Sequence, residues 1–233
     1  MSTSVIVPAA GSGVRLGENR PKAFVDVGGR SILWHTVFAI CEYSADDWFD
    51  LDRIIVVVPA DLMVAARHEA QSAADNAGRG TEVVVVPGGA ERSDSVRAGL
   101  AQATGEYVLV HDAARTFTPA AVFERVVGAL LEGHPVVVPG LPVVDTLKRV
   151  DQGGRVVQTV DRSVLRAIQT PQGFTADALA RAYADAGDTA TDDAGLAERA
   201  GLPVQVVEGD PLAFKITKQW DLRLARTISE GRD

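Results

Sequence analysis

Short runs of apolar, mostly β-branched residues alternate along this chain with longer segments whose apolar positions recur at helical spacing. A run without polar alternate positions is typical of a strand that is covered on both faces. Thr118 as N-cap and Pro119 in the first turn indicate where the fourth helical segment begins. The pattern predicts strands at 5–7, 54–58, 83–86, 107–110 and 136–138, with helices at 32–43, 62–77, 94–102 and 119–131.

Strands that alternate with helices form parallel βαβ units, which predicts the α/β class. We expect a Rossmann-like, mostly parallel sheet with helices on both faces. Ligands of such sheets bind at the carboxyl ends of the strands. The loops that begin at Pro8, Pro87 and His111 should therefore meet at one edge of the sheet.

The pattern changes after Pro139, where two short alternating segments, 142–149 and 156–159, flank Gly153 and Gly154. This predicts a β-hairpin with a glycine turn. A lone hairpin is marginally stable, so it needs a partner, most simply a second copy of this chain; a hairpin folded back on its own domain is the alternative. We expect one domain over 1–233 with a protruding β-hairpin dimerisation arm at about 142–165, then helices at 175–186 and 192–200, a strand at 204–207, a short strand at 214–216 and a closing helix from Lys218.

The composition is that of a soluble globular protein, with 46% hydrophobic and 23% charged residues among 233. A net charge of −8 and the lack of a basic run argue against nucleic acid as a partner, although a few cations can still form a nucleotide pocket. Neither a signal peptide nor a membrane-spanning run is present, so we expect no membrane partner. The single cysteine, Cys41, fits a cytoplasmic location, and the histidines lack zinc-ligand spacing.

The first predicted strand opens into a loop of small residues, Pro-Ala-Ala-Gly-Ser-Gly-Val-Arg at 8–15, and Pro21-Lys22 follows. Small residues let backbone N–H groups approach an anion, and Arg15 and Lys22 can cancel phosphate charge. The glycine spacing excludes a dinucleotide fingerprint, and Lys22 is not in a Walker sequence. The loop therefore predicts a nucleoside triphosphate site; a glycine-rich connection without a ligand is the alternative.

Asp112 follows the 107–110 strand directly, with Arg115 three residues later. A carboxylate in this position can hold Mg²⁺, which prefers one or two carboxylates plus phosphate oxygens. The planar fork of Arg115 suits a phosphate monoester. A helix-capping aspartate beside a solvated arginine is the alternative for such a pair.

Two further segments carry weaker signals. Glycines at 88–89 allow close backbone approach, and Ser93, Asp94 or Ser95 can cap the next helix, whose N-terminus would attract a phosphate or a ribose hydroxyl; capping alone also explains these residues. Lys215 stands between two apolar residues in the predicted strand 214–216. A partly buried ammonium is costly without a partner, so Lys215 should meet an anion.

These segments together resemble the 2-C-methyl-D-erythritol 4-phosphate cytidylyltransferases of the non-mevalonate isoprenoid pathway. The resemblance covers nearly the whole chain in order. Its motifs lie at 8–15, 21–22, 88–96, 110–115, 145–148, 159–162, 170–172, 191–193 and 215–217.

The resemblance implies transfer of CMP from CTP to methylerythritol 4-phosphate, with release of pyrophosphate and Mg²⁺ as cofactor. It implies that Arg15, Lys22 and Lys215 are catalytic, and that Asp112 holds the metal. It implies a CTP cradle of Pro8, Ala9, Ala10, Gly11, Gly13, Gly89, Ser95 and Ala113. It implies an acceptor site of Asp112, Arg115, Thr146, Arg162 and Thr170, in which Thr146 and Arg162 reach the site of the other subunit.

The chain departs from the family pattern at Ala90, Thr116 and Gly195. The first departure puts a side-chain contact to the ribose or base in doubt, and the second suggests a looser loop after Arg115. Two other functions stay open on the sequence. One is cytidylyl transfer to another polyol phosphate, notably ribitol 5-phosphate; the other is a non-catalytic nucleotide-binding module on the same fold.

Overall fold

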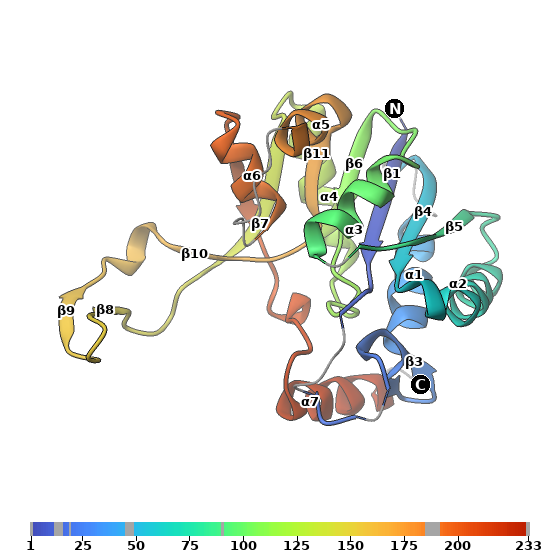
Figure 1. The fold of residues 1–233 in the computed structure, drawn as a ribbon, viewed down its shortest axis with the longest axis horizontal. Helices are drawn as coiled ribbons and strands as arrows, with labels where there is room; N and C mark the ends of the chain where they lie inside the picture. The colour runs from blue at the N-terminus through green and yellow to red at the C-terminus, as the bar shows by residue number, and fades with distance from the viewer. Residues whose placement is uncertain are drawn as a thin grey trace.

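A central sheet organises the computed structural model, which describes residues 2–11, 16–18, 20–44, 49–89, 91–184 and 192–231 (Figure 1). Among these residues the sheet has eight strands in the order β10-β7-β11-β6-β1-β4-β5, and β12 pairs with β7. The strands are β1 Thr3–Pro8, β4 Leu51–Val58, β5 Glu82–Pro87, β6 Tyr107–Val110, β7 Val136–Pro142, β10 Arg166–Ile168, β11 Gln172–Thr175 and β12 Gln205–Glu208.

Most pairings in the sheet are parallel. Strands β6, β1, β4 and β5 run parallel, and so do β7 and β12. Strand β11 lies antiparallel between β6 and β7, and β10 pairs antiparallel with β7. Strands β10 and β11 were not predicted, because their segment contains Pro171 and Gly173 and has no β-branched run. The predicted α/β fold with a mostly parallel sheet is confirmed.

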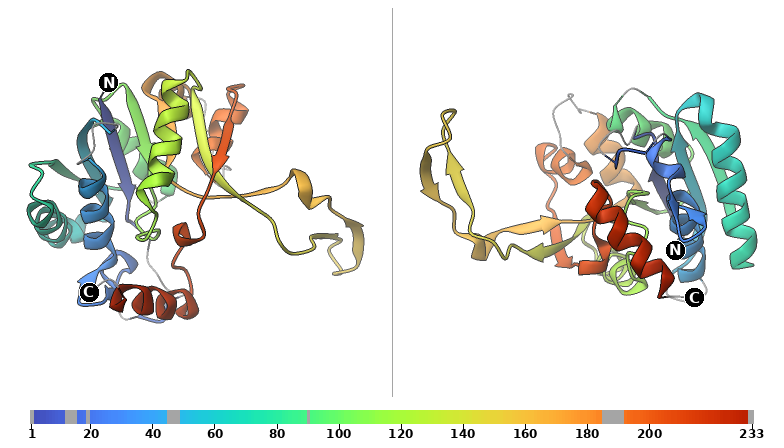
Figure 2. Two further views of the ribbon diagram at one scale, coloured as in Figure 1. Left: turned by 180° about the vertical axis from the view of Figure 1, so that it is seen from behind. Right: turned by 90° about the horizontal axis from the view of Figure 1, so that it is seen from below.

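Helices cover both faces of the sheet (Figures 1 and 2). Along β1, Val5 and Val7 belong to the apolar cluster under α1, α2 and α4, whereas Ile6 belongs to the cluster under α3, α5 and α6. Successive strand residues point to opposite faces, so a strand covered on both sides is apolar throughout. The helices are α1 Ile32–Tyr43, α2 Met63–Ala77, α3 Arg92–Leu100, α4 Ala120–Leu131, α5 Ala176–Ala184, α6 Asp193–Arg199 and α7 Gln219–Glu230.

Two predicted helix starts are wrong. Pro119, not Thr118, is the N-cap of α4, because the Thr118 hydroxyl donates to the carbonyl oxygen of Arg115 at 2.8 Å. Helix α3 begins at Arg92 with Glu91 as its N-cap, and the Asp94 carboxylate accepts from the backbone N–H of Glu91 at 3.2 Å. The cap therefore lies before Ser93, Asp94 and Ser95, the residues predicted to cap this helix.

The segment 214–216 is also not a strand. It follows a single 3₁₀ turn, η5 Pro211–Ala213, and the N–H of Ile216 donates to the carbonyl oxygen of Ala114 at 2.9 Å. This bond attaches the segment to the loop after β6 without a ladder of strand pairs. None of the helices in the described part of the chain is long and apolar enough to cross a membrane.

A third apolar cluster brings the two ends of the chain together. Leu16 and Val25 from the N-terminal part pack with Ile216 and with Leu222 of α7. The N-terminal part also forms η2 Lys22–Phe24 and the small pair β2 Asp26–Val27 and β3 Arg30–Ser31, beside α7 in Figure 1. Lys22 and Lys215 are thus carried on segments that share one small core.

A two-stranded antiparallel sheet of β8 Lys148–Val150 and β9 Val156–Thr159 extends away from the rest of the molecule (Figures 1 and 2). Gly154 at the turn has φ 78°, and the Asp151 carboxylate accepts from the N–H groups of Gly153 and Arg155. The first strand is shorter than predicted, because 143–147 forms no strand pairs. Strands β7 and β10 connect this hairpin, with η4 Arg162–Val164, to the central sheet.

Gly173 and Gly128 provide a matched test of how β11 packs against α4. A Cβ at Gly173 would lie 2.6 Å from a methyl carbon of Val126, whereas a Cβ at Gly128 meets nothing within 4 Å. We predict that Gly173→Ala lowers the free energy of unfolding by about 1–3 kcal/mol through overpacking. Gly128→Ala should raise it by up to about 1 kcal/mol through helix propensity. Urea denaturation measures the free energy of unfolding of both variants. If both substitutions changed it by the same amount and in the same direction, this packing would be contradicted.

Candidate active site

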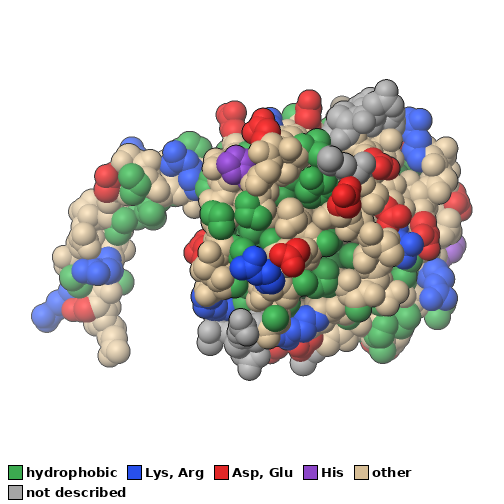
Figure 3. Space-filling view, turned by 90° about the horizontal axis from the view of Figure 1, so that it is seen from above, with side chains coloured by type: hydrophobic (Ala, Val, Ile, Leu, Met, Phe, Trp, Pro, Cys, Tyr) green, Lys and Arg blue, Asp and Glu red, His purple; other side chains and the backbone are tan. Residues whose placement is uncertain are grey.

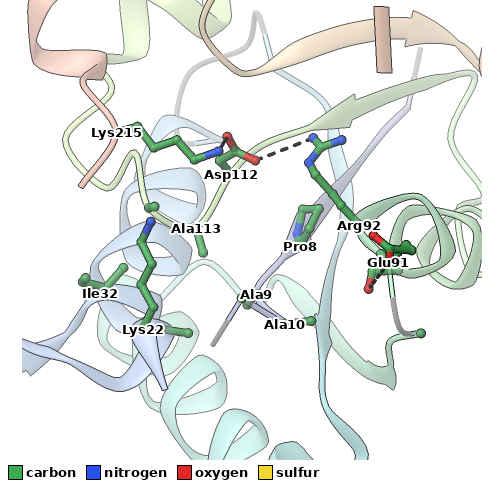
Figure 4. Close-up of a pocket in the computed structure, with 15 residues that line it drawn as sticks. Pro8, Ala9, Ala10, Lys22, Ile32, Glu91, Arg92, Asp112, Ala113 and Lys215 are labelled. Atoms are coloured by element: carbon green, nitrogen blue, oxygen red, sulfur yellow. Dashed lines mark hydrogen bonds and ion pairs between the residues drawn. The ribbon is translucent and has the colours of Figure 1, made fainter. Parts of the chain in front are cut away.

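A cavity of about 220 Å³ opens at the carboxyl ends of the parallel strands (Figure 4). The loops that begin at Pro8, Pro87 and His111 meet there, as predicted. Lys22 and Lys215 complete the wall from the two ends of the chain. The lining residues are Pro8, Ala9, Ala10, Gly11, Lys22, Ala23, Ile32, Gly89, Glu91, Arg92, Ser95, Asp112, Ala113, Ala114 and Lys215.

Small residues make one wall of this cavity. A Cβ at Gly11 would meet nothing within 4 Å, so this backbone faces open space. The Ser95 hydroxyl is buried and donates to the carbonyl oxygen of Glu91. A Cβ at Gly88 would lie 2.6 Å from the Ser95 hydroxyl oxygen. Close packing of the 88–89 backbone on α3 therefore requires glycine. Gly13, another predicted member of this wall, lies outside the described residues.

Two predicted cations line the cavity. Lys22 follows Pro21 in η2, and its side chain extends in Figure 4 toward Ala113 and Lys215. Lys215 reaches in from the segment after η5, with 40% of its side chain exposed. The third predicted cation, Arg15, lies outside the described residues.

Asp112 is the centre of charge in the cavity. Its carboxylate lies 2.7 Å from Lys215 Nζ, 3.6 Å from Arg92 Nη2 and 3.7 Å from Arg115 Nε. Burial alone would raise the pKa of Asp112, but the charges of Lys215, Arg92 and Arg115 outweigh it and lower the pKa from 3.8 to about 2. Asp112 is therefore ionised at neutral pH, and Lys215 meets the anion that its sequence context predicted.

A chain of hydrogen bonds holds the backbone of Asp112. Its N–H donates to the Thr170 hydroxyl at 3.1 Å, so that hydroxyl has its own proton available for His111 Nδ1, also 3.1 Å away. Thr170 is buried and does not line the cavity. This predicted acceptor-site residue thus contacts the loop that carries Asp112.

Arg115 joins three segments near the cavity without lining it. Its guanidinium donates to the carbonyl oxygen of Ala213 at 2.6 Å and to that of Ile168 at 3.4 Å. Nε is buried and makes no hydrogen bond. Burial lowers the pKa of Arg115. These contacts connect the loop after β6 with β10 and with the segment that carries Lys215.

Thr146 and Arg162 do not join the cavity of their own chain. Both are exposed on the protruding hairpin segment, outside the set of lining residues. Figure 2 shows that this segment extends away from the central sheet in both views.

Sequence reasoning missed Arg92. Its guanidinium lines the cavity and makes two hydrogen bonds to the Asp193 carboxylate, at 2.8 and 2.7 Å. Both residues lie within motifs of the family resemblance, but 101 positions separate them in the chain. Each motif contains a charged residue, and this was the only sign of the pair in the sequence. No spacing rule relates two residues that lie so far apart in the chain.

Among the described residues, Asp112 and Glu91 are the acidic residues that line the cavity. Within the described ranges, His, Cys, Asp and Glu form no group of three or more that could hold a metal ion. A donor set this small fits Mg²⁺, which binds through one or two carboxylates together with substrate phosphates. It does not resemble a structural zinc site.

The pKa of His111 leads to a pH-dependent stability. Burial lowers it from 6.5 to about 4, so between these values the unfolded chain binds more protons than the folded chain. We predict that the free energy of unfolding falls by about 3 kcal/mol as pH decreases from 6.5 to 4. Urea titrations of the wild type and His111→Gln measure the slope, with the exposed His68→Gln as matched control. An unchanged slope in His111→Gln would exclude His111 as its source.

Comparison with known proteins agrees with this geometry. The family model described as 2-C-methyl-D-erythritol 4-phosphate cytidylyltransferase matches residues 3–230. The enzymes of that name from Rhodococcus jostii and Nocardia farcinica are 53% and 55% identical, covering 97% and 99% of this chain and 94% and 95% of their own lengths. The crystal structure of the Thermus thermophilus enzyme of that name is 36% identical, with a TM-score of 0.77 over 99% of this chain and 100% of that one. The chain belongs to the 2-C-methyl-D-erythritol 4-phosphate cytidylyltransferase family.

Proposed function

We propose that this chain transfers CMP from CTP to 2-C-methyl-D-erythritol 4-phosphate. A phosphate oxygen of the acceptor forms a bond to the α-phosphorus of CTP, the bond from that phosphorus to the bridging oxygen breaks, and pyrophosphate leaves. The products are 4-diphosphocytidyl-2-C-methyl-D-erythritol and pyrophosphate. The observation that carries the proposal is the meeting of Lys22, Lys215 and Asp112 beside a wall of small residues in a member of this family.

Cancellation of negative charge is the main chemical task. An acceptor phosphate and a triphosphate repel each other, and negative charge accumulates at the phosphorus during the attack. Lys22 and Lys215 extend into the cavity from opposite ends of the chain. We propose that they, together with Arg15, are the catalytic cations, and that no protein nucleophile takes part.

The wall of small residues is the proposed CTP site. Pro8, Ala9, Ala10, Gly11, Gly89, Ser95 and Ala113 line the cavity. Gly13, two positions after Gly11 in the sequence, is proposed to belong to the same site. Backbone groups near Gly11 and Gly89 can approach the nucleotide closely because these residues have no side chain. The Ser95 hydroxyl lies beneath the 88–89 backbone.

Asp112 is the proposed ligand of Mg²⁺. When bound, the ion would withdraw negative charge from the triphosphate oxygens. Lys215 pairs with the same carboxylate, so we propose that Lys215 turns to a substrate phosphate when CTP occupies the cavity. Its partly exposed, flexible side chain is suited to that change.

Asp112, Arg115 and Thr170 belong to the proposed acceptor side of the cavity. Thr170 would act there through the Asp112 backbone, because its hydroxyl already contacts that N–H and His111. Thr146 and Arg162 are proposed to reach the acceptor site of a second copy of the chain, since the hairpin carries them away from their own cavity.

The hairpin is the proposed dimer contact. Five valines along it are 52% to 79% exposed, and Figure 3 shows hydrophobic and basic side chains together along this segment. An exposed apolar stripe on a hairpin without its own core indicates a surface that another protein covers. The valines are Val144, Val150, Val156, Val157 and Val164.

We also propose that the chain works as one nucleotidyltransferase domain in the cytoplasm, without nucleic acid or membrane partners. A net charge of −8 supports the first exclusion, and the buried free thiol of Cys41 is compatible with a reducing compartment. The names of the relatives specify methylerythritol phosphate, so no observation favours the ribitol phosphate alternative.

Turnover tests the proposed reaction. We predict that the purified chain releases pyrophosphate from CTP with Mg²⁺ and methylerythritol 4-phosphate, and far more slowly with ribitol 5-phosphate. Lys22→Ala should lower kcat by about 100-fold and weaken CTP binding much less, because its charge matters most in the transition state. Pyrophosphate release and calorimetric CTP titration measure the two quantities.

Arg20→Ala is the matched control, because Arg20 is an exposed cation two positions away that does not line the cavity. It should keep the wild-type kcat. CTP binding without turnover would favour the non-catalytic module, and a preference for ribitol phosphate would assign the other acceptor. Equal losses of kcat and CTP affinity would contradict the proposed role of Lys22.

Mixing two variants tests whether the hairpin completes a partner's site. We predict that Arg162→Ala raises KM for the acceptor about tenfold and leaves KM for CTP unchanged, since it removes a charged contact to a phosphate. Arg155→Ala at the hairpin turn is the control. After subunit exchange, Arg162→Ala mixed with Lys22→Ala should recover about a quarter of wild-type activity at low acceptor concentration, because half the dimers regain one intact site. A mixture no more active than its components would show that Arg162 serves its own chain.

A further inference from the structure

Two hydrogen bonds and an ion pair hold the Arg92 guanidinium in the wall of the cavity. Its Nη1 and Nη2 donate to the two oxygens of Asp193, and Nη2 also lies 3.6 Å from Asp112 Oδ1. One guanidinium thus bridges the carboxylate of the cavity and a carboxylate at the start of α6.

Asp193 has no access to solvent. Besides Arg92, its carboxylate accepts a 2.5 Å hydrogen bond from the Tyr183 hydroxyl of α5. A buried carboxylate strongly disfavours the loss of its cation, because removal leaves an uncompensated charge. The two hydrogen bonds to Asp193 therefore hold the Arg92 guanidinium beside Asp112.

Lys215 has the opposite character. It contacts the other oxygen of Asp112, Oδ2, through a flexible side chain that is 40% exposed. A substrate phosphate offers it a competing anion. When Lys215 moves, Asp112 loses its closest partner on one side, and Arg92 remains on the other.

We propose that Arg92 is a positioning residue. Asp193 and Tyr183 fix its guanidinium, and the guanidinium fixes the Asp112 carboxylate in the orientation that the reaction requires while Lys215 contacts a phosphate. This inference rests on the proposed cytidylyl transfer. It assigns a function to the Asp193 motif, which the reaction itself leaves without one.

A double-mutant cycle tests this connection with the full-length chain. We expect Arg92→Gln to lower kcat about tenfold or more and to change KM for CTP less than about threefold, because the CTP wall is built by other residues. Asp193→Asn should lower kcat about tenfold in the wild type and cause little further loss in Arg92→Gln. Tyr183→Phe should give a smaller loss of the same kind.

Arg97→Gln is the matched control, because Arg97 lies on the same helix with its guanidinium carbon 5.5 Å from the Tyr183 ring centre, yet does not line the cavity. It should keep the wild-type kcat. For Arg92→Ala, millimolar guanidinium chloride should restore part of kcat where equal sodium chloride does not. Such rescue requires a charge in place and is insensitive to a general loss of folding.

Losses that add in the double variant, an equal loss in Arg97→Gln, or no rescue by guanidinium would overturn the inference. A raised KM for CTP at unchanged kcat would do the same, since Arg92 would then bind substrate directly. If Asp193→Asn does not fold, Tyr183→Phe and the rescue experiment decide. An active wild type with full activity in Arg92→Gln refutes only this inference, whereas a wild type without turnover refutes the proposed function as well.

Discussion

The buried carboxylate of Asp112 is the constraint on which the site depends. A charge at this depth is stable only with cations around it. Lys215 and Arg92 come from other parts of the chain, and Arg115 lies three residues after Asp112 in the same loop. The pairs with Arg92 and Lys215 each connect a separate segment to the loop after β6. The ion pairs that keep Asp112 ionised therefore also determine where α3 and the C-terminal segment lie.

The third apolar cluster holds the two ends of the chain beside the sheet edge. Val25 and Ile216 share this core with α7, and the N–H of Ile216 donates to the loop after β6. Lys22 and Lys215 lie a few residues from these apolar side chains. The sequence places both lysines beside small or apolar neighbours, and this local pattern reflects the packing that holds them at the cavity.

Predictions succeeded where the physics is local. Continuous apolar runs identified β1 and β4 because both their faces are buried, and the carboxyl-edge rule for parallel strands brought the three loops together. Predictions failed where partners are distant in sequence. Strand β11 contains Gly173, whose place is explained by side chains of α4 and β6 that leave no room for a Cβ. The Thr118 hydroxyl donates to Arg115 instead of capping α4, and Arg92 pairs with Asp193 from another helix. The spacing of residues along the chain does not predict contacts between residues that are distant in sequence.

The protruding hairpin exposes both apolar and polar side chains that have no partner surface on the described part of their own chain. A cavity needs its polar groups close to the reacting atoms, yet Thr146 and Arg162 are exposed on a segment that leaves the body of the molecule. The valines beside them are exposed to water, and covering them with another surface would lower the free energy of the system. One event would satisfy both requirements, since an arm that buries its valines on a second copy also carries its polar residues to that copy. Under the proposed dimer, activity therefore depends on assembly, because each cavity remains incomplete until a partner's arm arrives.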